Sequence, residues 1–403
     1  MNCTLEFMYI RKAKTTIKCR GLAVSIPADL MLEKLSRLPV NSIGRFSCVS
    51  KLWGSMFRRP YVTELLSARP RLLLAVVRDG EWSFFSSPQP SDPYGNTSPV
   101  ATAYFQMKLF SEDMIPYGCS YTSGLIYFPD MWISKISVPV ICHPSTGQYA
   151  ILPKLYSFRK STSFLGFDRI GKQFKVLAEA YPFSDERVHH KVLTLGTGKL
   201  RWRSDIHCPA YDRSLSDGIC INGVLYYLAS TVCESSYVIV SFDVRSEKFK
   251  FIDASCFCDQ YSYKLINYKG RLGGISWSYV GSTLELRMLI LEDVEKHEWS
   301  RYVYSLGEKA IVDPKNVDIV GVTTATGEIV LCEKYRSSRP LCVFYFNPQK
   351  NTLQRVEIQG LEKNSKVYAF LDYAQDLNSN DAKQLLSSLV NQGLNISTER
   401  PKQ

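Results

Sequence analysis

The sequence lacks several features that would tie the protein to a membrane, a nucleic acid or the secretory pathway. No apolar run approaches the length of a membrane-spanning helix, and no long run of Lys or Arg appears, although the net charge is +11 over 403 residues. Near the first residue, Glu6 and the basic residues from Arg11 onward interrupt any apolar core of a signal peptide. We therefore expect no membrane association and no secretory signal. Nucleic-acid binding is not favoured, because the scattered positive charges form no basic patch.

Histidines are scarce, which limits the metal sites that the chain could build. There are five of them. The pair His189–His190 lacks a third ligand at metal-binding spacing, and neighbouring residues on a strand point to opposite faces. Cys256 and Cys258 could share a strand face, but no second Cys or His pair completes a zinc site. The sequence predicts no metal and no cofactor.

No set of residues suited to catalysis stands out either. His207 and Cys208 are adjacent in sequence, and adjacent side chains rarely meet as base and nucleophile. Residues 196–199, Gly-Thr-Gly-Lys, resemble part of a phosphate-binding loop but lack its full spacing, and they lie where a hairpin turn is expected. We expect a protein that is not an enzyme.

Cysteine, by contrast, is not scarce, and its abundance bears on the compartment. Twelve cysteines would suit a disulfide framework, but such frameworks belong to secreted proteins and no secretory signal is predicted. The cysteines are then small buried apolar residues in a reducing compartment. We expect the protein in the nucleus or the cytoplasm.

The composition otherwise indicates a folded protein that is rich in strands. Apolar residues make up 45% of the chain and aromatic residues 12%, with 24 Tyr and 20 Phe, and aromatic side chains favour strands. The length suits two or three domains, or one large β architecture with a smaller unit beside it.

A short helical unit covers residues 26–57. Pro27 suits the first turn of a helix, and Pro39 ends that helix shortly before it. Apolar residues at helical spacing then continue through Ile43 to Phe57. So short a unit has more apolar surface than it can bury internally. It is therefore either a terminal cap on a larger domain or a module that lays an apolar face against a partner.

From residue 72 onward the sequence changes to strand patterns with an internal repeat. Leu72 to Val77 and Trp82 to Phe85 flank Asp79-Gly80, which predicts a hairpin with a tight turn. Five further hairpins are predicted over residues 138–152, 191–203, 238–252, 287–302 and 342–358. Their turn markers, Gly147, Gly198, Glu247, Lys296 and Lys350, are 51, 49, 49 and 54 residues apart.

A period near 50 residues is typical of one four-stranded blade of a kelch-like β-propeller. Strand pairs between the hairpins, at residues 163–179, 218–228, 264–277 and 317–332, would complete the blades. About six periods fit. The last blade would then close by pairing strands near Leu72 to Phe85 with a strand at Val367 to Tyr373. A β-sandwich with irregular repeats is the alternative fold.

The helical unit resembles an F-box of the plant type. The resemblance rests on Ile26-Pro27, Asp29-Leu30, Leu35, Arg37-Leu38-Pro39, Ser42, Arg45-Phe46, Cys48-Val49-Ser50-Lys51 and Trp53, an ordered set that runs through the whole motif. Lys34 and Gly44 depart from the pattern.

The β region resembles the plant F-box-associated domain of the kelch-related kind, sometimes called type 3. The matching segments are residues 81–90, 144–149, 165–168, 193–198 and 217–228. His143 departs from that pattern, because Asn is usual there. We therefore expect an α+β multidomain protein with a basic leader over residues 1–24, a three-helix F-box over 25–69, a kelch-like propeller of about six blades over 70–375, and a polar C-terminal tail over 376–403.

The resemblance implies a substrate-recognition subunit of an SCF-type E3 ubiquitin ligase. Its F-box would bind a Skp-type adaptor, and through it a cullin-RING ligase, while the propeller would present an unidentified protein substrate. The adaptor-binding residues that the resemblance implies are Ile26, Pro27, Leu30, Leu35, Leu38, Pro39 and Ile43. Two alternatives stay open: a stand-alone propeller that acts as a binding protein or enzyme outside ubiquitin transfer, and a scaffold that binds the adaptor but no cullin.

Substrate specificity would lie in loops on one face of the propeller. Candidate loops are residues 92–97, 181–189 and 208–215. They contain Tyr94, Phe183, Arg187, Tyr211 and Arg213, and aromatic and Arg side chains of this kind are enriched where binding energy concentrates.

Overall fold

The chain divides into two compact units, one of residues 1–69 with 375–377 and the other of residues 70–374 with 378–403. A computed structural model describes parts of the second unit only: residues 71–89, 102–108, 118–133, 136–155, 158–183, 188–197, 200–204, 206–209, 211–231, 236–257, 263–280, 283–306, 314–324, 326–337, 339–373 and 380–391. The predicted leader and F-box helices lie outside these residues. None of the described residues belongs to a helix long and apolar enough to cross a bilayer.

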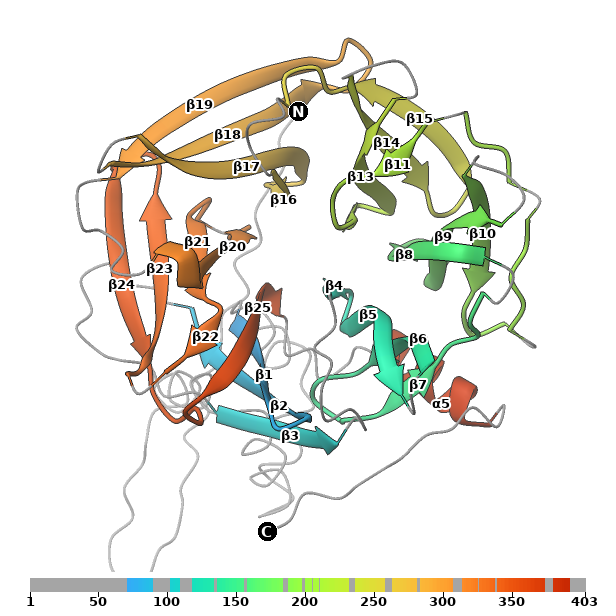
Figure 1. Cartoon of the computed structure of the whole chain (residues 1–403), viewed down its shortest axis with the longest axis horizontal. Coiled ribbons are helices and arrows are strands. Elements are labelled where there is room, and N and C mark those ends of the chain that lie inside the picture. The colour runs from blue at the N-terminus through green and yellow to red at the C-terminus, as the bar shows by residue number, and fades with distance from the viewer. Residues whose placement is uncertain are drawn as a thin grey trace, which may run out of the picture. The chain divides into compact units, whose positions relative to one another are not determined.

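Six β-sheets stand around a central opening as the blades of a propeller (Figure 1). From the inner strand outward, blade 1 consists of β25 (Ser365–Tyr373), β1 (Arg71–Arg78), β2 (Glu81–Pro88) and β3 (Thr102–Lys108), and the short β22 (Tyr335–Arg336) pairs with the inner edge of β25. Blade 2 consists of β4 (Ser120–Thr122), β5 (Leu125–Ile133), β6 (Ile136–Cys142) and β7 (Tyr149–Ile151). Blade 3 consists of β8 (Phe158–Asp168), β9 (Gln173–Pro182) and β10 (His189–Thr194).

The other three blades follow the same plan. Blade 4 consists of β12 (Ile219–Ile221), β13 (Val224–Ser230), β14 (Tyr237–Asp243) and β15 (Lys248–Asp253), with β11 (Arg213–Ser214) also pairing with β13. Blade 5 consists of β16 (Lys264–Tyr268), β17 (Arg271–Val280), β18 (Thr283–Asp293) and β19 (Glu298–Leu306). Blade 6 follows the 3-10 turn Pro314–Asn316 and consists of β20 (Val317–Val322), β21 (Ile329–Glu333), β23 (Leu341–Asn347) and β24 (Thr352–Ile358).

The hairpins predicted from the repeat form the two outer strands of blades 2 to 6. In blade 3 the outermost strand is reduced to a bridge between Val192 and Arg203. The four of these turns that the structure describes lie where they were predicted, although in two of them the left-handed residue comes one position after the marker, at His297 and at Asn351 (φ 56° and 50°). The marker Gly198 lies outside the described residues. The first hairpin is also confirmed, since Asp79 and Gly80 form its tight turn with φ of 49° and 75°.

The turns between the two outer strands of a blade show what an Asn or Asp contributes at the position that His143 occupies in blade 2. Asp243, Asp293 and Asn347 each use a side-chain oxygen to accept backbone N–H groups inside the turn, and the Asp243 bond to the Ser246 nitrogen is 2.6 Å long. His143 has no such oxygen. Its carbonyl accepts the Gly147 N–H at 2.9 Å, and its Nδ1 lies 3.1 Å from the Ser145 hydroxyl.

The ring closes by pairing the two ends of the propeller sequence. β1 pairs antiparallel with β25, with Leu73 opposite Phe370 and Ala75 opposite Tyr368. This closure, predicted from the sequence, is confirmed, and the alternative β-sandwich is wrong. Because closure pairs the inner edge of β1, the ring does not leave that edge exposed.

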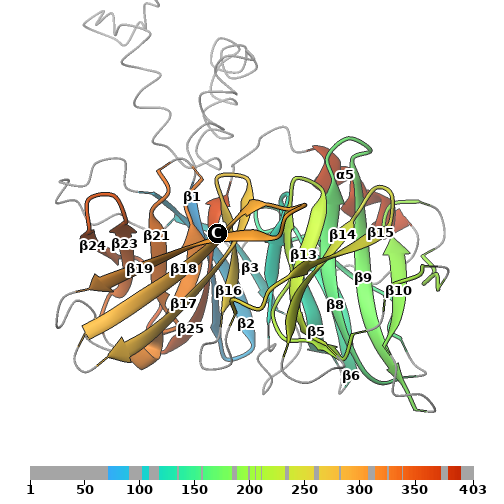
Figure 2. The ribbon, with the colours of Figure 1, turned by 90° about the horizontal axis from the view of Figure 1, so that it is seen from above.

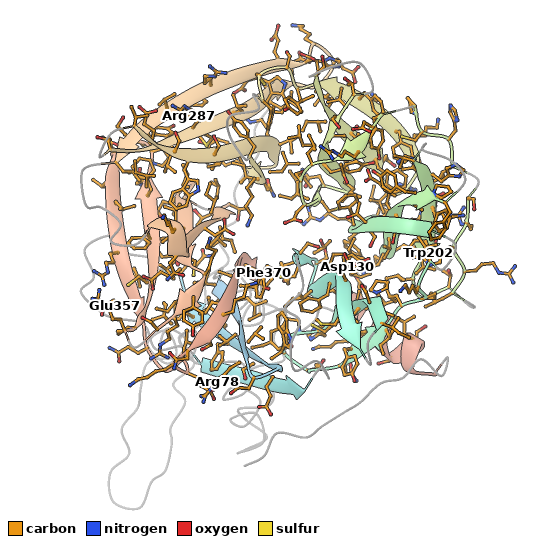
Figure 3. The ribbon with its side chains drawn as sticks, viewed as in Figure 1. Arg78, Asp130, Trp202, Arg287, Glu357 and Phe370 are labelled. Atoms are coloured by element: carbon orange, nitrogen blue, oxygen red, sulfur yellow. The ribbon has the colours of Figure 1, made fainter. Side chains whose placement is uncertain are left out.

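The core consists of six apolar clusters, one between each pair of neighbouring blades. Side chains fill these spaces (Figure 3). Both faces of a blade are therefore buried, which explains why β1 has seven consecutive buried residues instead of an alternating pattern. Between blades 1 and 2, for example, Trp82 stacks on Tyr368 and meets Phe128 edge-on.

A helix near the C-terminus extends the cluster between blades 2 and 3. The helix α5 (Asn380–Asn391) buries Ala382, Leu385, Leu386 and Leu389 against strands of both blades. Sequence reasoning assigned residues 376–403 to a polar tail and missed this helix. The apolar residues of α5 share one helix face, so the polar residues between them dominate the average composition.

The propeller has two distinct faces, seen edge-on in Figure 2. In blades 2 to 6, counted from the inner strand, the turn between the first and second strands and the turn between the third and fourth strands lie on one face, which we call the hairpin-turn face. We call the opposite face, where each inner strand begins and where the β1–β2 turn lies, the inter-blade face. Strand direction places the start of β1 and the end of β25, Arg71 and Tyr373, on the hairpin-turn face, since these two residues pair. The helix α5 also lies there, because Lys172 in the β8–β9 turn pairs with its Asp381 at 3.4 Å.

Candidate functional site

The adaptor-binding residues implied by the sequence all lie outside the described residues, so the structure leaves Ile26, Pro27, Leu30, Leu35, Leu38, Pro39 and Ile43 as predictions. Of the three candidate loops, residues 92–97 also lie outside. The described parts of the other two share the inter-blade face, and the Tyr181 hydroxyl donates to the Asp212 carbonyl at 3.5 Å between them. The sequence had not shown which loops share a face.

The candidate contact residues in these loops differ in exposure. Phe183 is 78% exposed at the end of β9, as a surface contact residue would be. Arg213 is also exposed, whereas Tyr94 and Arg187 lie outside the described residues. Tyr211 is only 4% exposed, so its interpretation as a surface contact is wrong.

Tyr211 instead ties its loop to blades 3 and 4 through a buried hydrogen-bond network. Its hydroxyl donates to Glu179 Oε1 and lies 2.6 Å from His190 Nε2 and 2.8 Å from the Tyr227 hydroxyl. Because its single proton goes to Glu179, His190 and Tyr227 must act as donors to Tyr211. The Ser214 hydroxyl donates to Glu179 Oε2 at 2.5 Å. Sequence reasoning missed Glu179 and Tyr227, because their partners are far away in the sequence.

The electrostatics of this network fit a structural clamp. Burial raises the pKa of Glu179, and hydrogen bonds from Ser214 and Tyr211 oppose that rise. Burial lowers the pKa of His190 to about 4, so the imidazole is neutral near pH 7. His189 is exposed while His190 is buried, as expected for neighbours on a strand. With Glu179 fully buried, the cluster offers no access to a substrate.

We predict that Tyr211→Phe destabilises the propeller by about 2–4 kcal/mol, since it removes three hydrogen bonds and leaves buried polar groups unsatisfied. Urea unfolding followed by circular dichroism measures this change. Tyr302→Phe is the matched control, because Tyr302 is exposed on β19. Equal stability of the two variants would contradict the clamp.

Exposed apolar residues gather on the inter-blade face. Each of blades 2 to 6 places one there, at a strand end or in an adjoining loop: Ile136, Phe183, Leu215, Val280 and Tyr335. The remaining large exposed apolar residues in the described part of the chain are Ile170 and Val294, in turns of the opposite face, and Tyr302 and Val303, on the outer strand β19. Single exposed apolar residues are common on protein surfaces, but their concentration on one face favours it as the protein-binding face.

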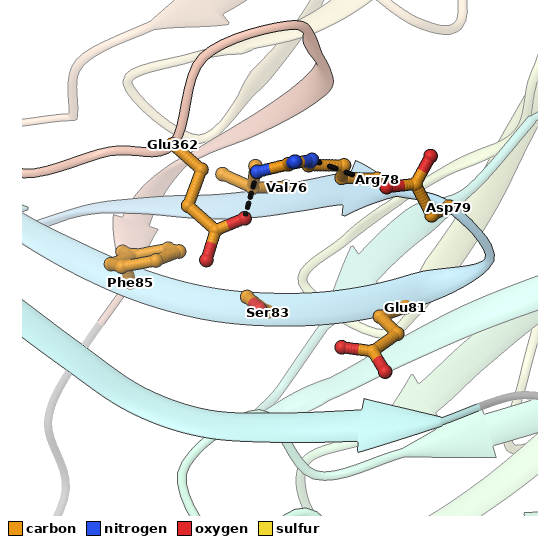
Figure 4. A pocket seen from close by; sticks show the side chains of 7 residues that line it. All are labelled: Val76, Arg78, Asp79, Glu81, Ser83, Phe85 and Glu362. Atoms are coloured by element: carbon orange, nitrogen blue, oxygen red, sulfur yellow. Dashed lines mark hydrogen bonds and ion pairs between the residues drawn. The ribbon is translucent and has the colours of Figure 1, made fainter.

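A hollow of about 280 Å³ lies on this face beside the β1–β2 turn (Figure 4). Its lining is apolar at Val76 and Phe85, neutral and polar at Ser83, and charged at the remaining residues, which are Arg78, Asp79, Glu81 and Glu362. Arg78 bridges Asp79 and Glu362, each at 3.2 Å. Exposed ion pairs of this kind contribute little, about 0–1 kcal/mol, so they would yield to a ligand. The hollow could hold one side chain of a partner, and its mixed charge selects neither a cation nor an anion.

Of the other residues singled out in the sequence, the structure describes His207, Cys208, Gly196 and Thr197. His207 and Cys208 are both partly or fully exposed loop residues, and burial raises the pKa of the Cys208 thiol to about 12, which opposes thiolate formation. Gly196 and Thr197 lie in the bend after β10, as expected of a turn. Among the described residues no group of three or more His, Cys, Asp or Glu could hold a metal ion.

Comparison with known proteins assigns a family to both parts of the chain. Residues 71–376 match the family described as F-box associated beta propeller domain, and residues 25–65 match the F-box domain. The F-box protein At3g57590 of Arabidopsis thaliana is 54% identical over 384 residues, which cover 90% of this chain and 94% of that protein. The putative F-box protein At5g42430 of the same plant is 52% identical over 369 residues, 88% and 91% of the two chains.

Among solved structures, the likeness to TolB is distant. TolB from Acinetobacter baumannii superposes with a TM-score of 0.45 at 10% identity, over 77% of this chain and 70% of that one. So distant a likeness has no bearing on function.

Proposed function

Because this chain belongs to the F-box proteins that carry an F-box associated beta propeller domain, we propose that it is the substrate-recognition subunit of an SCF-type E3 ubiquitin ligase. An F-box implies, in general, a Skp-type adaptor as partner. That adaptor would connect this chain to a cullin-RING ligase. The chain would contribute no chemical step, because holding a substrate beside the ubiquitin-transfer machinery is itself the source of rate enhancement.

The observation that carries this proposal is the pairing of the two matched regions, an F-box at residues 25–65 followed by a propeller at residues 71–376. The propeller's surface supports a role in protein binding. The exposed apolar residues of its described part gather on the inter-blade face, which suits contact with a protein substrate.

We place the adaptor contacts at Ile26, Pro27, Leu30, Leu35, Leu38, Pro39 and Ile43. Buried apolar side chains supply most of the free energy of such interfaces, at about 25 cal/mol for each Å² removed from water. For the compartment we propose the nucleus or the cytoplasm. Six described cysteines form no disulfide, which supports a reducing environment: Cys119, Cys142, Cys208, Cys220, Cys332 and Cys342.

The test is co-purification of the full chain with a Skp-type adaptor. We predict that the natural chain retains the adaptor and that the double variant Leu35→Asp, Pro39→Ala loses it, because a carboxylate would be buried in the apolar interface at a cost of several kcal/mol, about a hundredfold or more in affinity. Leu215→Asp is the matched control, since it adds the same charge at an exposed propeller site.

Circular dichroism establishes that the variants remain folded. Failure of the folded natural chain to bind the adaptor would overturn the proposal. The function would then have to be sought in the propeller alone.

A further inference from the structure

A short excursion from blade 6 reaches the inner edge of blade 1 on the inter-blade face. After β21 the chain runs through β22 (Tyr335–Arg336), which pairs antiparallel with the start of β25, placing Tyr335 opposite Lys366 and Arg336 opposite Ser365. β22 is thus the innermost strand of the five-stranded sheet of blade 1. It lies where β25 begins, and its label stands near those of β1 and β25 in Figure 1.

Hydrogen bonds hold this excursion in one conformation. The Asn316 side chain donates to the Tyr335 carbonyl and accepts the Tyr335 N–H, both at 2.9 Å. The Lys334 N–H donates to the Asn316 carbonyl at 2.6 Å, and the Lys334 carbonyl accepts the Val367 N–H at 2.7 Å. Tyr335 nevertheless remains 45% exposed. An aromatic ring that is both exposed and held by a rigid backbone loses little entropy on binding a partner.

Five cationic residues surround Tyr335. Lys334 and Arg336 flank it in the sequence, and Lys366 lies opposite it on β25. Lys315 precedes Asn316, whose side chain bonds Tyr335, and the Arg339 carbonyl accepts a hydrogen bond from Arg336 Nε at 3.3 Å. Within the described part of the chain, none of the five forms an ion pair.

The acidic groups in this region are already engaged by backbone donors. Glu333 Oε2 accepts the Cys342 N–H at 2.8 Å, and Asp318 Oδ1 accepts the Ile319 N–H at 2.9 Å. Glu362, which precedes β25 in the chain, already pairs with Arg78 at 3.2 Å. These three carboxylates are fewer than the five cations. Burial lowers the pKa of Lys366, and the nearby Lys334 ammonium lowers it further. In addition, Arg336 Nη1 is buried with no hydrogen-bond partner among the described residues.

We propose that this surface, formed by Lys315, Lys334, Tyr335, Arg336, Arg339 and Lys366, binds an anionic segment of a partner protein. Carboxylate or phosphate groups would neutralise the unpaired cations, and Tyr335 would pack against an apolar part of the same segment. The proposal deepens the proposed function and rests on it, because it assigns the chemical class of the protein to be recognised.

A protein segment fits this surface better than a nucleic acid does. Single-stranded nucleic acids are bound by several aromatic rings on which successive bases stack, whereas Tyr335 is the one aromatic residue among the six described residues that form this surface. The same face carries exposed Phe183, Val280 and Leu215, which suit apolar side chains of a protein.

The experiment measures fluorescence anisotropy of labelled peptides added to the full chain, alone and in complex with its adaptor. The probes are a Glu-rich peptide, the same peptide with phosphoserine in place of Glu, and its uncharged Gln counterpart. An oligothymidine of matched charge tests the nucleic-acid alternative. We expect one or both anionic peptides to bind, the Gln peptide not to bind, and the affinity to fall with added salt.

Two double variants decide whether the binding is specific to this surface. Lys334→Gln with Arg339→Gln removes two exposed cations, and we expect at least about tenfold weaker binding of the anionic peptide. Lys248→Gln with Lys350→Gln removes the same charge from the hairpin-turn face and should leave binding unchanged. Arg336→Gln adds a second test once its thermal stability has been compared with that of the natural chain.

Equal binding by the two double variants, or equal binding of the Gln peptide, would overturn the proposal. The proposal would also be overturned if the chain bound oligothymidine in preference to the peptides and the double variant Lys334→Gln, Arg339→Gln abolished that binding. A preference between the Glu and phosphoserine peptides distinguishes carboxylate from phosphate recognition, and either result supports an anionic segment. Adaptor co-purification is scored separately, so the two proposals fail distinguishably. Peptide binding without adaptor binding would refute the ligase role, and the surface would then bind an anionic partner outside ubiquitin transfer.

Discussion

A chain that ends after Glu362 is expected to lose the cooperative unfolding transition of the propeller, whereas a chain that ends after Gln375 is expected to keep it. The first chain lacks β25, whose residues pair with β1 from Arg71 to Val77. It would leave β1 as an unpaired edge beside two opened clusters, those between blades 6 and 1 and between blades 1 and 2.

The size of the loss can be judged from the side chains of β25. Val367 is buried, Tyr368 stacks on Trp82, and Phe370 packs in the cluster between blades 1 and 2. Each such side chain contributes about 1.5–3 kcal/mol of burial, so several together approach the about 5–15 kcal/mol that separates folded from unfolded domains. Closure is therefore worth as much as the whole stability of a typical domain.

The chain that ends after Gln375 separates closure from loss of the helix. It keeps β25 and lacks only α5, so its cooperative transition should persist at a lower temperature. Leu386→Ala is a finer control, because a fully buried Leu in a helix costs about 2–5 kcal/mol when truncated. Differential scanning calorimetry measures the transitions. A cooperative transition at the natural midpoint in the chain ending after Glu362 would contradict closure by β25.

Acid is expected to destabilise the propeller between about pH 6.5 and 4, well before most carboxylates titrate. Burial lowers the pKa of both His143 and His190 from 6.5 to about 4, and Lys383 of α5 lowers that of His143 further. The unfolded chain takes up these protons first. The stabilising contribution is thus complete above pH 6.5 and is lost as pH falls toward 4. A shift of this size corresponds to about 3 kcal/mol for each histidine.

One group in the same network acts in the opposite direction. The pKa of Glu179 is raised in the folded state, so its stabilising contribution is present at low pH and is lost as pH rises through that value. Acidification recovers part of the stability there. The net slope is still expected to be set by the histidines, because two of them act together and each is shifted far.

His143→Asn and His190→Gln test this dependence one residue at a time. His143→Asn should flatten the pH profile and also stabilise the β6–β7 turn by about 0.5–1 kcal/mol, because an amide oxygen can accept the backbone N–H groups as Asn347 does. The free energy of unfolding in urea, measured from pH 7.5 down to pH 4, gives the slopes. His297→Gln is the control, since His297 is exposed. Slopes that stay unchanged in both His143 and His190 variants would show that neither histidine carries the acid sensitivity.

The blade-forming hairpins were predictable because the interactions that specify them are local. Asp79-Gly80 specifies its turn through backbone conformations that few other residue pairs adopt. The repeat near 50 residues then indicated a propeller, and pairing between strands at the two ends of the propeller followed from the need to protect their edges. The F-box was predicted separately, from the resemblance of residues 26–53 to that family. The helices themselves stay a prediction, because residues 1–70 lie outside the described residues.

Other features depended on residues that meet only after folding. Tyr is a residue type that is common at binding surfaces, yet Tyr211 is buried, and Glu179, His190 and Tyr227 on other strands form hydrogen bonds with its hydroxyl. The helix α5 was missed because its apolar stripe is stabilised by packing against the cluster between blades 2 and 3, and the sequence does not show that contact. The five cations around Tyr335 come from three separate stretches and give no basic run in the sequence.

The sequence by itself determined the blade-forming hairpins and their order, the ring closure and the family, since turn chemistry, strand periodicity and motif spacing act over a few residues. Only the tertiary structure decided which loops share the inter-blade face, which polar residues are buried, and where unpaired charges gather. Those properties depend on the distance between residues that are far apart along the chain. Nothing in the local pattern of one strand encodes that distance.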